Sequence, residues 1–162
     1  MPRYGKTLEK YFEQQGRKWS RASILSLGIR LIDIFEQVHS SGYTYNDLKL
    51  DNLLIGFQEK LPHHYTDDDC FANCSINLLD FGFASRFQKK HTHEILPQKE
   101  LEVFHGNMLF SSINQLNFQS TSRRDDLISL GYLLVFLFNE GNMPGINLYD
   151  ELSRNESFKL IR

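Results

Sequence analysis

One apolar stripe along residues 20–40 constrains the fold of this chain more than any other feature. Ser20 precedes the stripe as an expected N-cap, and Ser41 with Gly42 ends it. Its members recur at spacings of three and four residues: Ile24, Leu27, Leu31, Ile34, Phe35 and Val38. This spacing predicts a long α-helix that buries one side against a core.

A second helix is predicted from Asp126, where leucines recur with helical spacing as far as Leu137. Phe136 and Phe138 fill other faces, so we expect this helix to be buried nearly all round. The other expected elements are a short helix from its N-cap Thr7 to Phe12, strands at Leu53–Ile55 and Ile76–Leu79, a surface connection at residues 63–70 and a weaker helix at 148–161. The predicted fold class is mainly α with a few short β-strands.

The composition fits such a fold and excludes several classes of protein. Hydrophobic residues make up 41% of the 162 residues, which allows a sizeable core and argues against disorder. The formal net charge of -2 offers no basic field, so neither nucleic acid nor a membrane is an expected partner. No apolar run follows the first residues, so no secretory signal is expected.

Two polar motifs contain the candidate functional side chains. Asp47-Leu48-Lys49-Leu50-Asp51-Asn52 precedes the first strand, and Asp80-Phe81-Gly82 follows the second. Phosphoryl transfer needs an Asp to accept a hydroxyl proton, a Lys to stabilise the moving phosphoryl group, and an Asn and an Asp to hold Mg²⁺. Each motif alone is also compatible with a solvated turn. Together they assign Asp47 and Lys49 as catalytic, Asn52 and Asp80 as ligands of metal and cofactor, and ATP and Mg²⁺ as the cofactors.

The order of these motifs resembles that of protein kinases, and further residues resemble the casein kinase I family. Ser112-Ile113-Asn114 stands where most kinases carry A-P-E, and residues 122–132 read SRRDDLISLGY, nearly as in that family. The resemblance implies that residues 1–162 are a partial protein kinase domain, with hinge, catalytic loop, magnesium loop and central helix of the large lobe. It also implies protein substrates, and a cytoplasmic and also nuclear location.

The same resemblance implies roles for individual residues. Met1 would occupy the gatekeeper position, and Pro2 and Tyr4 would bind adenine through their backbone groups. Asp126 would begin the central helix and brace the catalytic loop.

Several positions depart from the family pattern. Tyr45-Asn46-Asp47 stands for H-R-D, so the Arg that meets a phosphorylated activation loop is missing and regulation by that route is not expected. Leu109 stands where an Arg would help to bind an acidic or phosphorylated group, so a preference for such substrates is not implied. Asn107 replaces a Thr that would brace Asp47 and Lys49.

A larger departure concerns the ATP-binding lobe. Residues 1–162 contain no G-x-G-x-x-G loop and no V-A-I-K lysine, so we expect a large lobe without its small lobe. One hypothesis is a serine/threonine kinase of casein kinase I type that phosphorylates protein hydroxyls. The other is a truncated pseudokinase or protein-binding module without catalysis. In both cases we expect the surface for the small lobe to carry apolar residues and to serve in association.

Overall fold

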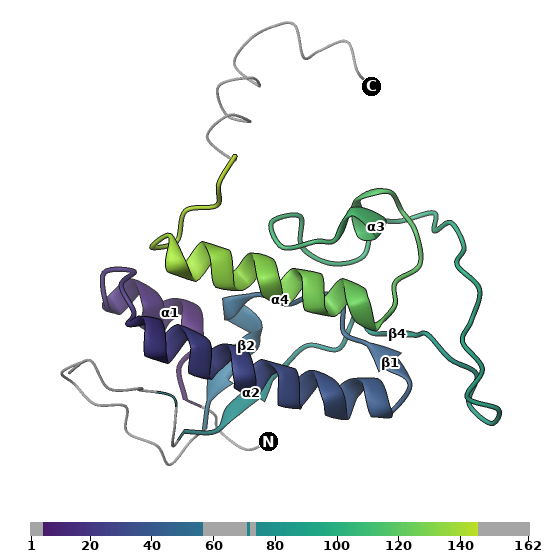
Figure 1. Cartoon of the computed structure of the whole chain (residues 1–162), viewed down its shortest axis with the longest axis horizontal. Helices are drawn as coiled ribbons and strands as arrows, with labels where there is room; N and C mark the ends of the chain where they lie inside the picture. The colour runs from purple at the N-terminus through teal and green to yellow at the C-terminus, as the bar shows by residue number, and fades with distance from the viewer. Residues whose placement is uncertain (1–4, 57–70, 72–73, 146–162) are drawn as a thin grey trace, which may run out of the picture.

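Two long helices frame the molecule. Its structure is a computed structural model that describes residues 5–56, 71 and 74–145. Helices α2 (Arg21–Ser40) and α4 (Arg123–Phe138) lie side by side (Figure 1). The shorter elements are α1 (Leu8–Gln14), β1 (Tyr43–Thr44), the 3₁₀-helix η1 (Leu50–Asn52), β2 (Leu53–Ile55), β3 (Ile76–Leu78), β4 (Ser85–Arg86) and α3 (Ile113–Leu116). The prediction of helices with a few short strands is confirmed at this coarse level.

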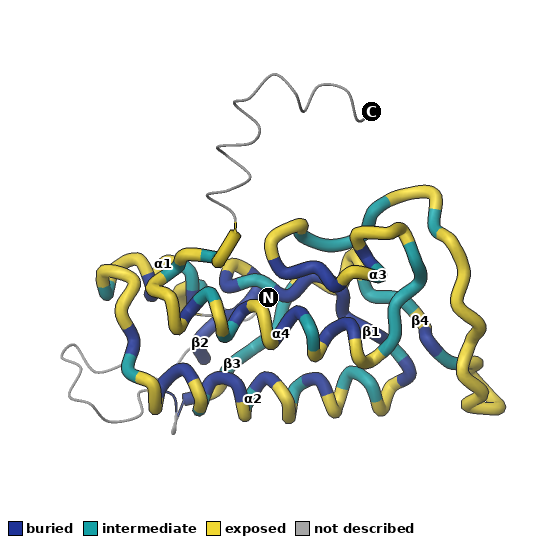
Figure 2. The backbone as a smooth tube through the Cα atoms, turned by 45° about the horizontal axis from the view of Figure 1, so that its top comes forward, coloured by how far each residue is buried: buried dark blue, intermediate teal, exposed yellow. Residues whose placement is uncertain are grey.

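Helix α2 forms as its sequence predicts. The Ser20 hydroxyl accepts the N–H of Ser23 at 3.1 Å, which caps the first turn. The helix ends at Ser40 with Ser41 as its C-cap, and Gly42 follows with a φ of 86° that favours glycine. Figure 2 shows buried and exposed residues alternating along the helix. The apolar stripe is fully buried at four positions and partly buried at Ile34 and Val38.

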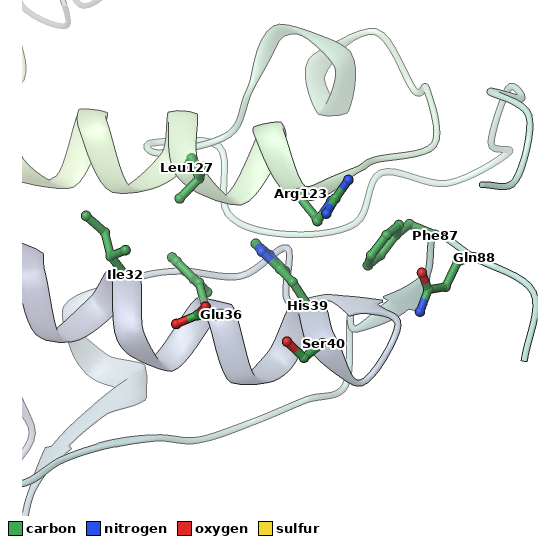
Figure 3. Close-up of a pocket in the computed structure, with 9 residues that line it drawn as sticks. Ile32, Glu36, His39, Ser40, Phe87, Gln88, Arg123 and Leu127 are labelled. Carbon is green, nitrogen blue, oxygen red and sulfur yellow. The ribbon is translucent and has the colours of Figure 1, made fainter. Parts of the chain in front are cut away.

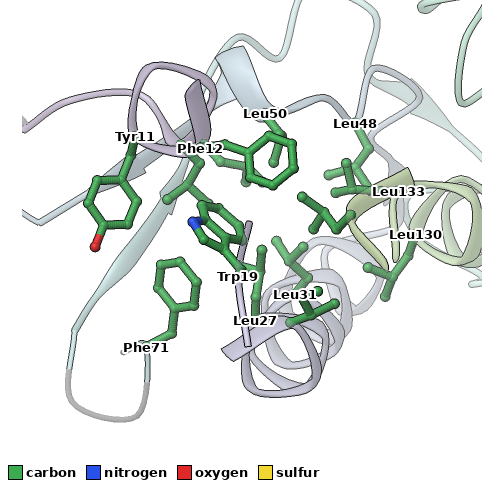
Figure 4. Packing of buried hydrophobic residues seen from close by; sticks show 14 of the residues in the cluster. Tyr11, Phe12, Trp19, Leu27, Leu31, Leu48, Leu50, Phe71, Leu130 and Leu133 are labelled. Atoms are coloured by element: carbon green, nitrogen blue, oxygen red, sulfur yellow. The ribbon is translucent and has the colours of Figure 1, made fainter. Parts of the chain in front are cut away.

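The core lies where α1, α2, α4 and the polar motif around residue 47 meet (Figure 4). At one end, the Trp19 ring packs against Phe12 and Phe71, with centroids 4.9 and 5.0 Å apart. Leu48 and Leu50 of the polar motif are buried in the same cluster. These two leucines anchor the motif in the core by apolar burial.

Two small antiparallel sheets bring the polar motifs together. In one, β2 pairs with β3, with Leu53 opposite Leu78 and Ile55 opposite Ile76. The predicted strand at 76–79 ends one residue earlier, although the Leu79 N–H still donates to the Asn52 carbonyl at 2.9 Å. In the other sheet, β1 pairs with β4. Strands β1 and β4, of two residues each, and the four-residue helix α3 were not predicted, because they are too short to show a period.

Helix α4 differs from its prediction in two ways. It begins at Arg123 and not at Asp126, because Ser122 and Asp125 form a capping box at its first turn. In this box the Ser122 N–H donates to Asp125 Oδ2 at 2.7 Å. The expectation of a helix buried all round is wrong for the described residues. Leu130, Leu133 and Leu137 are buried. Four other large side chains are exposed: Leu127, Tyr132, Val135 and Phe138.

Some predictions fall outside the described residues. These are the roles of Met1, Pro2 and Tyr4, the connection at residues 63–70 and the helix at 148–161. Among the helices that the structure describes, none combines the length and the apolar character that a bilayer crossing demands.

Candidate active site

Asp47 lies at the centre of the candidate site. Its side chain is 1% exposed. Its Oδ2 accepts hydrogen bonds from Lys49 Nζ at 2.8 Å and from Asn52 Nδ2 at 2.9 Å. Its Oδ1 has a longer contact, 3.4 Å from Asn107 Nδ2. The structure therefore brings three of the predicted site residues into one hydrogen-bonded cluster.

The local sequence explains this cluster. Leu48 and Leu50 turn into the core, which leaves Lys49 and Asp51 facing outward. The turn of η1 is closed by the Asn52 N–H, which donates to the Lys49 carbonyl at 3.1 Å. The Asn52 side chain also donates to the Asp47 carbonyl at 3.0 Å. Apolar anchoring and these bonds together fix the position of the Asp47 carboxylate.

Asp126 holds the chain just before Asp47. Its Oδ2 accepts the N–H of Tyr45 and its Oδ1 accepts the N–H of Asn46, both at 2.8 Å. His39 Nε2 also donates to Oδ2 at 2.8 Å. The Asp126 side chain is buried, so these bonds supply the partners that a buried carboxylate requires. The contact that the resemblance implied, between Asp126 and the loop before Asp47, is present.

His39 was not predicted as part of this arrangement. It lines a groove of about 580 Å³ between α2 and α4 (Figure 3). Its ring stacks on Phe35 with centroids 5.6 Å apart and meets Phe87 edge to face at 6.3 Å. Nothing in the spacing of residues links His39 to Asp126, because they lie 87 positions apart. His39 thus supports Asp126 from the groove side.

Asp80 lies beside Asn52 at the end of the β2–β3 sheet. The bond from Leu79 N–H to the Asn52 carbonyl places the next residue, Asp80, at that end. Asp80 is exposed, has a φ of 55°, and accepts the Gly82 N–H on Oδ1 at 3.1 Å. This turn presents the carboxylate to solvent.

The chemistry of these two side chains fits Mg²⁺. Mg²⁺ prefers oxygen ligands and usually takes one or two from protein, filling its shell with water and phosphate oxygens. Asn52 directs its Nδ2 group to Asp47, so Oδ1 is the atom through which it would bind the ion. Asp80 supplies a carboxylate. Among the described residues there is no cluster of three or more His, Cys, Asp or Glu side chains that could hold a metal.

Tyr45 connects the two motifs. Its hydroxyl donates to the Leu79 carbonyl, and its ring meets that of Phe81 edge to face at 5.3 Å. Burial raises the pKa of Tyr45 above its ordinary value. A hydrogen bond with the Asn52 side chain partly opposes this rise, and the nearby charges of Asp47, Asp80 and Asp126 add to it. The hydroxyl therefore stays protonated and remains a donor.

Tyr45→Phe is expected to lower the free energy of unfolding by about 1–2 kcal/mol at pH 7, because the Leu79 carbonyl loses its donor. The pKa of the folded Tyr45 is raised, so only the unfolded state loses this proton just above pH 10.0. The contribution of the Tyr45 hydroxyl to the free energy of unfolding is therefore fully present below that pH and decreases above it. Urea unfolding from pH 7 to 11 should show the advantage over Tyr45→Phe shrinking above pH 10.0; a constant difference would contradict this.

The segment at residues 105–115 closes the site from another side. Asn107 Nδ2 donates to the Leu48 carbonyl at 2.8 Å in addition to its longer contact with Asp47. Gly106 has a φ of 123°, and a Cβ there would lie 2.4 Å from the Asn46 carbonyl oxygen. Glycine is therefore required at this close approach. Asn107 thus reaches both the Asp47 side chain and the carbonyl of the next residue.

Asn46 stands where the resemblance to kinases would place an Arg, and its side chain makes neutral hydrogen bonds. Its Nδ2 donates to the Phe83 carbonyl at 2.8 Å and to Ser85 Oγ at 3.0 Å. Gln115 Nε2 donates to the Asn46 carbonyl at 2.9 Å. These neutral bonds tie the loop before Asp47 to the chain that follows Asp80-Phe81-Gly82, and they need no phosphate.

A comparison with protein-family models found no match to this chain.

Proposed function

We propose that this chain forms the acceptor- and magnesium-binding half of a serine/threonine protein kinase of casein kinase I type. The observation that carries the proposal is the cluster of Asp47, Lys49 and Asn52, with Asp80 beside Asn52. Residues that are separate motifs in the sequence lie at one place, and each has the side chain that phosphoryl transfer needs.

Each side chain has a defined task in this proposal. The hydroxyl oxygen of the acceptor attacks the γ-phosphorus of ATP while the bond to ADP breaks, and Asp47 accepts the hydroxyl proton. Oδ1 suits this task because its contact with Asn107 is longer than the two bonds on Oδ2. Lys49 Nζ is partly exposed and lies 2.8 Å from Asp47, where it would stabilise the transferred phosphoryl group. Mg²⁺ held by Asn52 and Asp80 would neutralise charge on the triphosphate.

Phosphoryl transfer also needs a Gly-rich loop and a lysine to position the phosphates. Residues 1–162 contain neither motif, so the proposal assigns these groups to another part of the polypeptide or to a partner. The surface next to Asp80 suits such an association. Phe81 is 51% exposed, and with Val38 and Tyr43 it lines a mostly apolar hollow of about 510 Å³.

Asp80→Asn is expected to weaken magnesium-dependent ATP binding by about a hundredfold, since a neutral amide replaces the charged ligand. The fold should be retained, because the new amide oxygen still accepts the Gly82 N–H. The measurement is the shift in melting temperature of the natural full-length polypeptide with ATP, with and without Mg²⁺. The matched control is Asp51→Asn, an exposed Asp in the neighbouring motif, which should keep the wild-type shift.

The second candidate is a pseudokinase or protein-binding module without catalysis. One observation favours it: Asp47, Lys49 and Asn52 satisfy one another by hydrogen bonds, as a purely structural cluster would. For this candidate we expect no shift in melting temperature with Mg²⁺ and ATP, and no phosphate transfer to protein hydroxyls. Phosphate transfer to protein hydroxyls by the wild type, abolished in Asp80→Asn and kept in Asp51→Asn, would exclude it.

A further inference from the structure

Two apolar side chains are exposed directly beside the proposed catalytic Asp. Met108 is 76% exposed and Leu109 is 38% exposed. They follow Asn107, whose side chain contacts both the Asp47 carboxylate and the Leu48 carbonyl. Consecutive Cα atoms lie about 3.8 Å apart, and Met108 and Leu109 are one and two positions after Asn107. Both residues are therefore close to the Asp47 carboxylate that Asn107 contacts.

The turn that exposes them is fixed at both ends. Asn107 Oδ1 accepts the Phe110 N–H at 3.0 Å, and the Ser111 hydroxyl donates to the Asn107 carbonyl. Phe110 is buried, with its ring 5.4 Å from that of Phe136. Because both ends of the turn are held inward, Met108 and Leu109 are directed outward. A turn held in this way is already organised for binding.

The turn and the residues next to it in the sequence carry no charged side chain that would recognise an acidic group. Residues 105–119 include no Lys, Arg, Asp or Glu. The nearby Lys49 is already paired with Asp47 at 2.8 Å. On the following helix α3, Ile113 and Leu116 are also exposed, which continues the apolar character. An acidic side chain would lose hydration here without gaining a partner, whereas an apolar one would gain contact.

We infer that Met108 and Leu109 select acceptor proteins in which an apolar side chain, and not an acidic or phosphorylated one, flanks the reacting hydroxyl. The inference rests on the proposed function, because it names the substrate class of the same site. The two residues determine specificity and take no part in the chemical step.

The test is phosphate transfer by the natural full-length polypeptide, with Mg²⁺ and ATP, to a panel of synthetic peptides. Each peptide has one Ser, and each flanking position is replaced in turn by Ala, Leu, Asp or phosphoserine. At one flanking position or more, Leu should exceed Asp and phosphoserine in kcat/KM by about tenfold, the usual scale for a modest hydrophobic contact. Leu109→Arg should shift the preference towards Asp. Leu96→Arg is the matched control, because Leu96 is also 38% exposed but lies outside this turn.

The outcomes separate the two ideas. If no peptide is phosphorylated by the wild-type polypeptide and protein hydroxyls fail as well, the proposed function is overturned. If peptides are phosphorylated but Asp or phosphoserine is preferred, or no flanking residue matters, only this inference is overturned. If Leu109→Arg does not fold, the wild-type panel alone still decides, since a preference for Leu supports the inference and its absence contradicts it.

Discussion

Asp47→Asn is expected to lower kcat for phosphoryl transfer by about a thousandfold, which is within the usual contribution of a general base. An amide does not accept the hydroxyl proton. The variant should fold, because its amide oxygen can take the place of Oδ2 and accept from Lys49 and Asn52. Its NH₂ group would then face the Asn107 amide, where the contact is already long at 3.4 Å.

The measurement is steady-state transfer from ATP to protein by the natural full-length polypeptide, together with its melting temperature. Asp33→Asn is a suitable control, because Asp33 is an exposed Asp on α2. We expect the control to keep the wild-type kcat. Wild-type activity in a folded Asp47→Asn variant would show that Asp47 is not the base.

Asp126→Ala is expected to lower the free energy of unfolding by about 3–5 kcal/mol, the cost typical of removing one partner from a buried charged network. The change leaves the N–H groups of Tyr45 and Asn46 buried without their acceptor. It also removes the acceptor of His39. We therefore expect the loop before Asp47 to lose its fixed conformation, so activity should fall together with stability.

Urea unfolding of wild type and variant measures this effect directly. Glu36→Ala is the matched control, because Glu36 is an exposed carboxylate that lines the same groove as His39 (Figure 3). Its stability should stay within about 0.5 kcal/mol of wild type, as is usual for surface positions. Equal stability of the two variants would show that Asp126 does not hold the loop.

The sequence predicted the elements whose signals are local. Helix α2 has a full apolar stripe and a Ser at its start, so both its face and its N-terminus were predictable. The start of α4 was misplaced, because its first turn is Arg123 to Asp126 and carries no apolar period. Its exposed face was also missed, since periodicity shows which residues are apolar but not which neighbours cover them. Strand β4 is defined only by its partner β1.

The candidate site shows the same division. Asp47, Lys49 and Asn52 lie within one short motif, so residue types and spacing were sufficient to predict the cluster that the structure shows. His39 and its bond to Asp126 were not predictable, because the two side chains meet only when α2 packs against α4. For Asn107, the sequence indicated a position near Asp47, and the structure adds its bond to the Leu48 carbonyl.

The distance along the chain between Asp126 and the loop that it holds has a consequence for biosynthesis. The Tyr45 N–H and its carboxylate acceptor are separated by 81 residues. A ribosome adds about 5–20 residues per second, so the loop is made roughly 4–16 s before the residue that fixes it. During that interval the nascent polypeptide contains every residue of the Asp47 motif but lacks the partner that orders it. The loop before Asp47 can therefore take its fixed conformation only after residue 126 has left the ribosome.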